Sequence, residues 1–250
     1  MPDYTIPNLK NACLILKELS RLDQSRSIAE IADMLELPRT TALRILYTLE
    51  QEGFVKKQGK NFSLGATLIA LGSRALSRFS IREMASSHLR TITEYTNETS
   101  QLVTLTADKA LILDVFASPH PLSAHSKPGT LADVHCSASG KAILAFASAE
   151  TQKDVLHGLT LNKRTEKTIT TRKGLISELK KVFDQGYAID EEEYHEGVRC
   201  LAAPVLDSAG VTTYALGITA SCKRFTKNKI EEYADVVMRQ AKALSETLGA

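Results

Sequence analysis

The segment 27–53 constrains the fold more than any other part of this 250-residue chain, because it reads as two short helices joined by a tight turn. Ser27 followed by Glu30 is the signature of a capping box, which begins a helix. Pro38 disfavours helical geometry in the residue before it and suits the first turn of the second helix. Gly53 is typical of the position that follows a helix end. The first helix is predicted to bury one apolar stripe at helical spacing, formed by Ile28, Ile31, Ala32 and Leu35.

The second of these helices has an apolar face and a polar face. Helical spacing places Ala42, Leu46 and Leu49 on one side and Thr40, Arg44, Tyr47 and Gln51 on the other. Arginine can bond to guanine edges or to phosphate, and hydroxyl and amide groups can bond to either. The polar face therefore suits the groove of a DNA duplex. An ordinary helical hairpin with a solvated face fits the periodicity equally well.

A short basic hairpin is predicted directly after these helices. Residues 54–64 form two extended runs around a turn that contains glycine. Between residues 38 and 64, five lysines and arginines stand against two glutamates, a local net charge of +3. A basic hairpin beside a recognition helix would lie along the phosphate backbone as a wing. The predicted DNA contacts are Arg39, Thr40, Thr41, Arg44, Tyr47, Lys56, Lys57 and Lys60.

The overall composition is that of an ordinary globular protein, with 43% apolar residues, 24% charged residues and a formal net charge of +2. A charge this small confines any nucleic-acid contact to a local patch. The start of the chain lacks the pattern of a signal peptide, and no apolar run is long enough to span a bilayer. The four cysteines form no CxxC pair, which argues against structural zinc and a disulfide framework. We expect a cytoplasmic protein.

Periodicity predicts a helical N-terminal part and a mixed C-terminal part, an α+β organisation with a largely antiparallel sheet. A helix over 8–22 would complete a three-helix core with the two helices above, and a linker helix over 64–79 would follow the hairpin. Further helices are expected over 81–95, 138–147, 149–158, 170–183 and 226–248. Strands are expected over 101–106, 110–116, 200–206 and 212–220, with a strand and a long loop within 120–134.

Asp190, His195 and Cys200 place an acid, an imidazole and a thiol within eleven positions. They could form a Cys/His nucleophile pair, or a metal site together with His135 or Cys136. Two simpler interpretations compete. Cys200 begins an apolar strand, where cysteine is usually a small buried hydrophobe, and the acidic run 190–196 would be solvated. We favour the simpler interpretations and keep an enzyme that processes small molecules, or binds a metal, as the alternative function.

The segment 186–207 closely resembles the signature of the isocitrate-lyase-regulator (IclR) family. Eight residues occupy signature spacing, namely Gly186, Asp190, Glu193, Cys200, Leu201, Ala202, Val205 and Asp207. Leu206 departs from the aromatic residue or histidine that is usual in the family. Residues 135–142 resemble a second family motif, and the N-terminal helices, hairpin and linker match in order and length. The resemblance thus covers nearly the whole chain.

This resemblance implies a bacterial or archaeal transcriptional regulator that is not an enzyme and needs no cofactor. It implies a winged helix-turn-helix domain over 1–64, a linker helix over 65–80 and a GAF/PAS-like effector-binding domain over 81–250. Members assemble as dimers or tetramers, so we expect a palindromic double-stranded DNA operator. Effectors in the family are small carboxylic acids or aromatic catabolites.

The resemblance also assigns residues to the effector site. The backbone N–H groups of Ala138 and Ser139 would bind a carboxylate at the start of a helix. Asp190, Cys200 and Thr219 would supply side chains to the same pocket. Gly217 would line it where relatives often have a hydroxyl, which would leave more room and one donor fewer.

Overall fold

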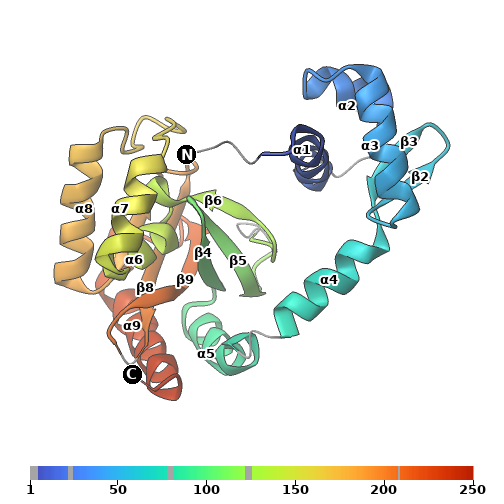
Figure 1. Ribbon diagram of the computed structural model, residues 1–250. Coiled ribbons are helices and arrows are strands. Elements are labelled where there is room, and N and C mark those ends of the chain that lie inside the picture. Colours follow the sequence, from blue (N-terminus) through green and yellow to red (C-terminus); the bar gives the residue numbers. More distant parts are fainter. Residues whose placement is uncertain (1–4, 22–24, 78–80, 122–125, 208, 250) are drawn as a thin grey trace. The chain divides into compact units, whose positions relative to one another are not determined.

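The computed structural model describes residues 5–21, 25–77, 81–121, 126–207 and 209–249 (Figure 1). The chain divides into two compact units, residues 1–80 and residues 81–250. Each unit buries a hydrophobic core of its own. Within the described residues, no helix combines the length and the apolar character needed to cross a bilayer.

The N-terminal unit packs three helices against a small antiparallel sheet of strand order β1-β3-β2. Its elements are α1 (Pro7–Arg21), β1 (Arg26–Ser27), α2 (Ile28–Met34), α3 (Arg39–Gln51), β2 (Val55–Gln58), β3 (Asn61–Leu64) and α4 (Ala66–Ser77). The core takes one side chain or more from each of the three helices and from the hairpin, including Ile15, Ile31, Leu46 and Phe62. The predicted three-helix core and basic hairpin are therefore present.

Local signals define the ends of α2 and α3. The Ser27 hydroxyl accepts a hydrogen bond from the Glu30 N–H while the Glu30 carboxylate accepts one from the Ser27 N–H, which confirms the capping box. Pro38 is the N-cap of α3 and not a residue of its first turn, so that prediction was wrong by one position. Gly53 has φ of 72°, and the Phe54 N–H donates to the Leu49 carbonyl at 2.8 Å. This left-handed turn ends α3 and directs the chain into the hairpin.

The C-terminal unit contains a six-stranded antiparallel sheet of order β6-β5-β4-β9-β8-β7. Its strands are β4 (Thr99–Thr106), β5 (Lys109–Phe116), β6 (Leu131–Asp133), β7 (Ala188–Glu191), β8 (Val198–Leu206) and β9 (Thr212–Ser221). Its helices are α5 (Ile81–Thr96), η1 (Val134–Cys136), α6 (Ala138–Phe146), α7 (Ala149–Gly158), α8 (Arg172–Gln185), η2 (Lys227–Lys229) and α9 (Ile230–Thr247).

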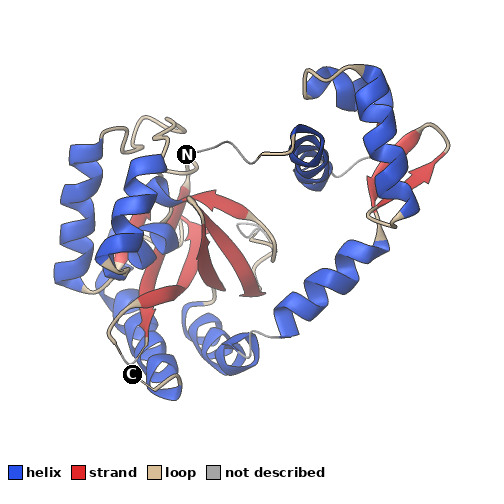
Figure 2. Cartoon of the chain, viewed as in Figure 1, coloured by secondary structure: helices blue, strands red, loops and turns tan. Residues whose placement is uncertain are grey.

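Helices cover both faces of this sheet (Figure 2). On one face α5 packs against β4, and α9 packs against β8. On the other face α6 packs against β8 and β9 and is itself covered by α8. Every residue of α6 from Ala138 to Ala145 is buried. The fold is therefore α+β with an antiparallel sheet, as predicted, and α6 is its central covering helix.

The structure differs from the sequence prediction mainly at short strands. Two-residue β1 and four-residue β7 were not predicted. β1 is too short to show a period of two, and β7 runs into the acidic segment 190–196, which was interpreted as a solvated loop. Within 120–134, the strand that was expected is the three-residue β6, and residues 122–125 lie outside the described part of the chain. The same holds for Leu22 and Phe79, at the predicted ends of two helices.

Candidate functional site

The exposed face of α3 carries the polar side chains expected there. Thr40, Arg44 and Tyr47 are exposed, whereas Ala42 and Leu46 are fully buried on the opposite side of the helix. The helix is held by its apolar stripe, so its polar face is free to meet a ligand.

Arg39 and Thr41 flank this face. The Arg39 side chain is 69% exposed, and its Nη2 lies 3.8 Å from a carboxylate oxygen of Asp33, a surface contact that holds it weakly. Thr41 is partly buried and, with Arg44, lines a groove of about 380 Å³ that α1 and α3 form together. The Thr48 hydroxyl donates to the Arg44 carbonyl at 3.0 Å. Thr41 and Thr48 thus lie toward α1, at the margin of the polar face.

The hairpin after α3 presents its lysines to solvent. Lys56, Lys57 and Lys60 are exposed, and Val55 is the buried residue of β2. The Lys57 ammonium lies 5.8 Å from the ring centre of Phe62, its cross-strand partner on β3. A cation above an aromatic ring is weakly attracted to it. The hairpin therefore exposes its lysines and buries Val55 and Phe62 in the core of the unit.

Leu43 also lies on the exposed part of α3, with 48% of its surface accessible, and sequence reasoning missed it. An exposed apolar side chain on a recognition helix can contact the methyl group of thymine. A leucine at helical spacing normally indicates core, so the sequence held no signal for this role.

In the C-terminal unit, three of the predicted effector residues form one row across the sheet. Asp190 pairs with Cys200, Cys200 with Thr219, and Thr219 with Thr99, on strands β7, β8, β9 and β4. Directly opposed residues of antiparallel strands point to the same face. The Cys200 Sγ lies 3.5 Å from the Thr219 Oγ1. Residues from four separate strands thus meet on one sheet face.

The start of α6 lies over the next row of the same face. The Ser137 hydroxyl accepts from the Gly140 N–H at 3.2 Å, while no hydrogen bond of the described residues uses the N–H groups of Ala138 and Ser139. The buried Ser139 hydroxyl has no partner either. A helix start with free N–H groups favours an anion.

The surroundings of Gly217 contradict the prediction that its missing side chain leaves more room in the pocket. A Cβ at this position would lie 2.7 Å from the Leu201 carbonyl oxygen and 3.3 Å from the Ser139 Oγ. The missing side chain therefore does not leave open room, because the neighbouring strand and the α6 start already fill it. Glycine is needed here for close approach of these elements.

A buried ion cluster adjoins the Asp190 row, and sequence reasoning missed it. Lys141 of α6 is fully buried, with its ammonium 2.5 Å from Glu193 Oε1 and 3.4 Å from Glu178 Oε1. Asp190 and Glu193 are 1% and 8% exposed, so the expectation that the acidic run 190–196 is solvated was wrong for these two. The signal available was a single lysine inside the otherwise apolar segment 138–147.

Burial raises the pKa values of both acids in this cluster. The pKa of Asp190 rises to about 6, because desolvation outweighs the two backbone N–H groups it accepts from and the charge of Lys141. The pKa of Glu193 rises to about 7, since desolvation again outweighs Lys141, and Asp190 and Glu178 add repulsion. Burial disfavours the charged form of a carboxylate. The two acids therefore hold protons more readily than exposed ones.

The nucleophile and metal hypotheses find no support in the geometry. Cys200 contacts Thr219, while His195 is exposed and lies edge-on to Tyr194. Burial raises the pKa of the Cys200 thiol well above its usual value, the opposite of an activated thiolate. Among the described residues, no group of three or more histidine, cysteine or acidic side chains could hold a metal ion.

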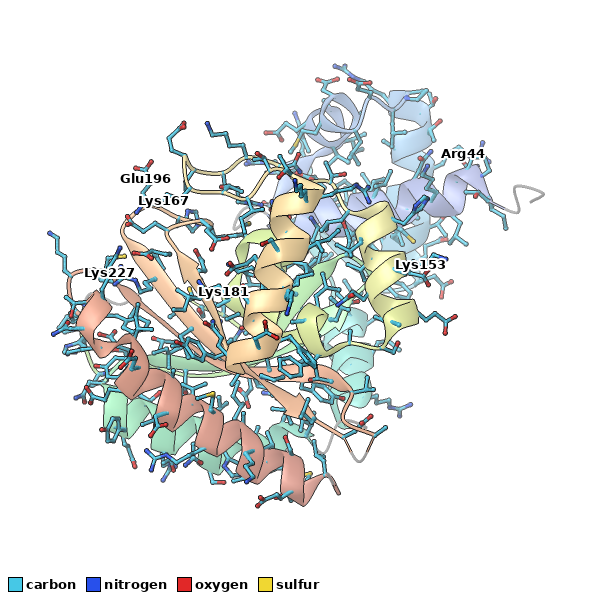
Figure 3. All side chains as sticks on the ribbon, turned by 90° about the vertical axis from the view of Figure 1, so that its left-hand side faces the viewer. Arg44, Lys153, Lys167, Lys181, Glu196 and Lys227 are labelled. Atoms are coloured by element: carbon cyan, nitrogen blue, oxygen red, sulfur yellow. The ribbon has the colours of Figure 1, made fainter. Side chains whose placement is uncertain are left out.

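The segment 159–171 covers this end of the unit. The Thr168 hydroxyl donates to the Glu193 carbonyl at 2.7 Å and accepts from the Thr165 N–H at 2.8 Å. Arg164 lies 4.4 Å above the Tyr194 ring centre. Lys167, labelled in Figure 3, pairs with Glu192 at 2.5 Å. The covering segment is thus tied to the loop that follows Asp190.

Comparison with known families matches both units. Residues 9–59 match the IclR helix-turn-helix domain, and residues 73–246 match the C-terminal part of the bacterial transcriptional regulator IclR. The chain is similar to the HTH-type transcriptional regulator KdgR of Escherichia coli strain K12, with 31% identity over 235 residues, which cover 92% of this chain and 89% of KdgR.

Solved structures share the fold. The crystal structure of IclR from Thermotoga maritima matches with a TM-score of 0.73 and 34% identity, covering 98% of this chain and 100% of that one. An IclR homolog from Microbacterium hydrocarbonoxydans, crystallised with 4-hydroxybenzoate, matches with a TM-score of 0.78 and 23% identity, covering 97% and 99%. This second likeness concerns the fold alone.

Proposed function

Because the chain belongs to the IclR family of bacterial transcriptional regulators, we propose that it binds a palindromic operator and that a small organic acid or aromatic effector controls its affinity for that operator. Residues 1–64 would bind DNA, residues 65–80 would link, and residues 81–250 would bind the effector. The observation that carries the DNA-binding role is the polar face of α3 beside the basic hairpin.

The side chains of α3 and the hairpin suit different parts of a duplex. Arg44 lies in the middle of the polar face, where it would bond to a base edge, and Leu43 would contact a thymine methyl group. Arg39 and Thr40 lie at the helix start, where backbone N–H groups also favour phosphate. The hairpin lysines would follow the phosphate backbone.

Selection of binding sites from a random pool of DNA duplexes tests this role with the intact chain. We expect enrichment of a two-fold symmetric sequence whose half-sites lie about one helical turn apart, or a multiple of it. The Arg44→Ala variant should enrich a more degenerate sequence. A pool that the intact chain leaves unenriched would contradict the DNA-binding role.

The effector role rests on the row of Asp190, Cys200 and Thr219 next to the start of α6. Free N–H groups at Ala138 and Ser139 offer a place for a carboxylate. The 4-hydroxybenzoate bound by the Microbacterium homolog belongs to the same chemical class. Ala138, Ser139, Asp190 and Thr219 are buried and Cys200 is partly buried, so we propose that an effector enters when the covering segment 159–171 moves.

A thermal-shift screen of small acids and aromatic catabolites tests the effector role. A ligand that binds only the folded chain must raise its unfolding temperature. We expect a hit that also changes operator affinity, measured by fluorescence anisotropy of a labelled operator. Hits that leave operator affinity unchanged would separate ligand binding from regulation and refute the proposal.

We further propose assembly as a homodimer or a dimer of dimers. Several apolar side chains of the N-terminal unit are exposed on helices. The exposed fraction is 61% for Leu9 on α1, 72% for Ile69 on α4 and 50% for Leu71 on α4. Apolar side chains this exposed on helices suit contact with a second copy. Light scattering should give at least a dimer, and Ile69→Glu with Leu71→Glu should reduce its stability. A monomer at micromolar concentration would contradict this part.

A further inference from the structure

The second half of β8 has an open edge on the side of β7. β7 pairs with β8 only from Arg199 to Ala202, whereas β9 pairs with β8 as far as Leu206. A groove of about 450 Å³ lies along this open edge, between the end of β8, the last turns of α9 and the ends of α6 and α8. Grooves of about 300–1,000 Å³ are large enough for small organic ligands.

The groove is separate from the row of Asp190, Cys200 and Thr219. It lies at the other end of the same elements, about 12 Å from the start of α6 at Phe146 and about 13 Å along β8 from Cys200 at Pro204. The described residues that line it include none of those assigned to the effector site. A ligand in this groove would therefore occupy a second site.

The open edge of β8 is short of hydrogen-bond donors. The Val198 carbonyl accepts from the Glu192 N–H on this side of the strand, so alternate residues after Val198 also present their backbone groups to it. Pro204 has no N–H, and the Leu206 N–H already donates to the Ser245 Oγ at 2.8 Å. An added peptide strand needs donors as well as acceptors from an edge. A peptide strand is thus a poor occupant of this groove.

The free backbone group in the groove is an acceptor. The Pro204 carbonyl faces the same side as the Leu206 N–H, and no hydrogen bond among the described residues uses it. The Ser245 hydroxyl gives its own proton to the Ala241 carbonyl at 2.8 Å, so it has none left for a ligand. The side chains around the carbonyl are apolar, including those of Phe146 and Met238. The lining therefore suits an apolar molecule that brings one donor.

The charges at the rim of the groove oppose each other. Lys242 and Glu246 are both exposed and lie four residues apart on α9. Opposite charges at this helical spacing compensate each other. The rim therefore favours neither an anion nor a cation, and an ion that entered the apolar lining would lose hydration at a cost in free energy.

We propose that this groove is a second ligand site, which binds an uncharged apolar molecule with one hydroxyl group, such as a medium-chain alcohol. The hydrocarbon part packs against Phe146, Leu206 and Met238, and the hydroxyl donates to the Pro204 carbonyl. A carboxylate has no proton for this bond, and an ammonium ion pays for its lost hydration. The proposal does not depend on DNA binding or on the effector site.

Titration calorimetry of the full chain with 1-octanol, octanoate and octylammonium tests the ligand class, because the three share one hydrocarbon chain. Met238→Trp fills the groove and so identifies the binding that occurs there, and Thr247→Trp, at an exposed residue of α9, is its control. In the groove, 1-octanol should bind at least roughly tenfold more tightly than either ion. No loss of 1-octanol binding in Met238→Trp, or an ion that binds there as tightly, would overturn the proposal.

A second variant tests the backbone argument without filling the groove. Ser245→Ala frees the Leu206 N–H as a donor, so octanoate should gain affinity relative to 1-octanol. Thr247→Ala is the matched control, because its hydroxyl also bonds to the carbonyl four residues earlier, at 3.0 Å, but lies outside the groove. An affinity ratio that Ser245→Ala leaves unchanged would contradict the proposed hydroxyl bond.

Light scattering on the same variants tests the other occupant, a second copy of the chain. Met238→Trp should leave the oligomeric state as it is in the parent. A change of oligomeric state in Met238→Trp, with none in Thr247→Trp, would make the groove an interface between copies and overturn the ligand site.

Discussion

The side chains of α3 and of the hairpin are expected to contact different parts of the DNA duplex, and single substitutions distinguish these contacts. Arg44 lies mid-face, so Arg44→Ala should weaken operator binding by about 1–3 kcal/mol and relax the sequence preference at one position. Anisotropy titrations of the operator and of a scrambled duplex at equal salt measure both effects. Equal operator affinity of variant and parent would exclude a base contact by Arg44.

Lys57 is expected to contact the phosphate backbone of the DNA and not its bases. Its removal in Lys57→Ala should lower affinity for all duplexes and reduce the slope of log K against log salt by about 1. Lys153, exposed on α7 and labelled in Figure 3, gives the matched control Lys153→Ala, which should leave the slope intact. A slope that Lys57→Ala does not change would remove the hairpin from the interface.

Lys141 neutralises part of the buried cluster, so its loss should destabilise the C-terminal unit. Lys141→Met leaves two carboxylates without their cation, and breaking a buried pair in this way typically costs about 3–5 kcal/mol. The loss should be larger at pH 8 than at pH 6, because Glu193, with a pKa of about 7, is protonated more fully at the lower pH. Urea unfolding of parent and variant at both pH values measures this decrease in the free energy of unfolding. An equal decrease at pH 6 and pH 8 would contradict the charge-based explanation.

At the scale of elements, the buried hydroxyls of Thr165 and Thr168 bond the covering segment 159–171 to the loop after Asp190, beside the ion pairs of Arg164 and Lys167. Thr168→Val removes the bonds to the Glu193 carbonyl and to the N–H groups of Arg164 and Thr165. Amides over 163–168 and 190–194 should then exchange faster with deuterium, because local opening costs less free energy. Thr170→Val, at an exposed threonine of the same segment, should leave exchange unchanged. Unaltered protection in Thr168→Val would show that other contacts hold the segment.

Which elements the sequence predicts depends on how local their cause is. The capping box at Ser27, the turn at Gly53 and the long alternating strands arise from neighbouring residues, and the structure confirms them. The burial of Asp190 and Lys141 arises from tertiary packing of β7 against β8 under α6, which no local pattern reveals. The family motif assigned Asp190 to the site, but only the structure showed which charges surround it.

At the scale of the whole molecule, stability should depend on pH through the buried acids. The folded pKa values of Asp190 and Glu193 are raised to about 6 and about 7, so the folded chain binds more protons than the unfolded chain. Stability should therefore rise as the pH falls from about 8 toward about 5. At still lower pH it should fall, because Asp133, Glu191 and Glu192 have lowered pKa values and lose their ion pairs on protonation.

Calorimetric unfolding of the full chain across this range measures the effect on the transition of the C-terminal unit. Lys141 and Glu178 are charged groups near the two acids, and the nearby thiols of Cys136 and Cys200 stay protonated because burial raises their pKa values. The double variant Asp190→Asn with Glu193→Gln should flatten the rise. A parent chain that loses stability steadily from pH 8 to pH 6 would refute the prediction.

The order of strands in the sheet has a consequence for how the protein is made. β9 is the last strand in the chain, yet it lies between β4 and β8 and supplies Thr219. Residues 1–80 are synthesised long before it and can fold as a unit on the ribosome. A message cut short before codon 212 would therefore yield a product that carries the DNA-binding surface without a finished sensor. The affinity of such a product for the operator would no longer respond to the effector, so mutations that truncate the chain between the end of the first unit and codon 212 should abolish effector control.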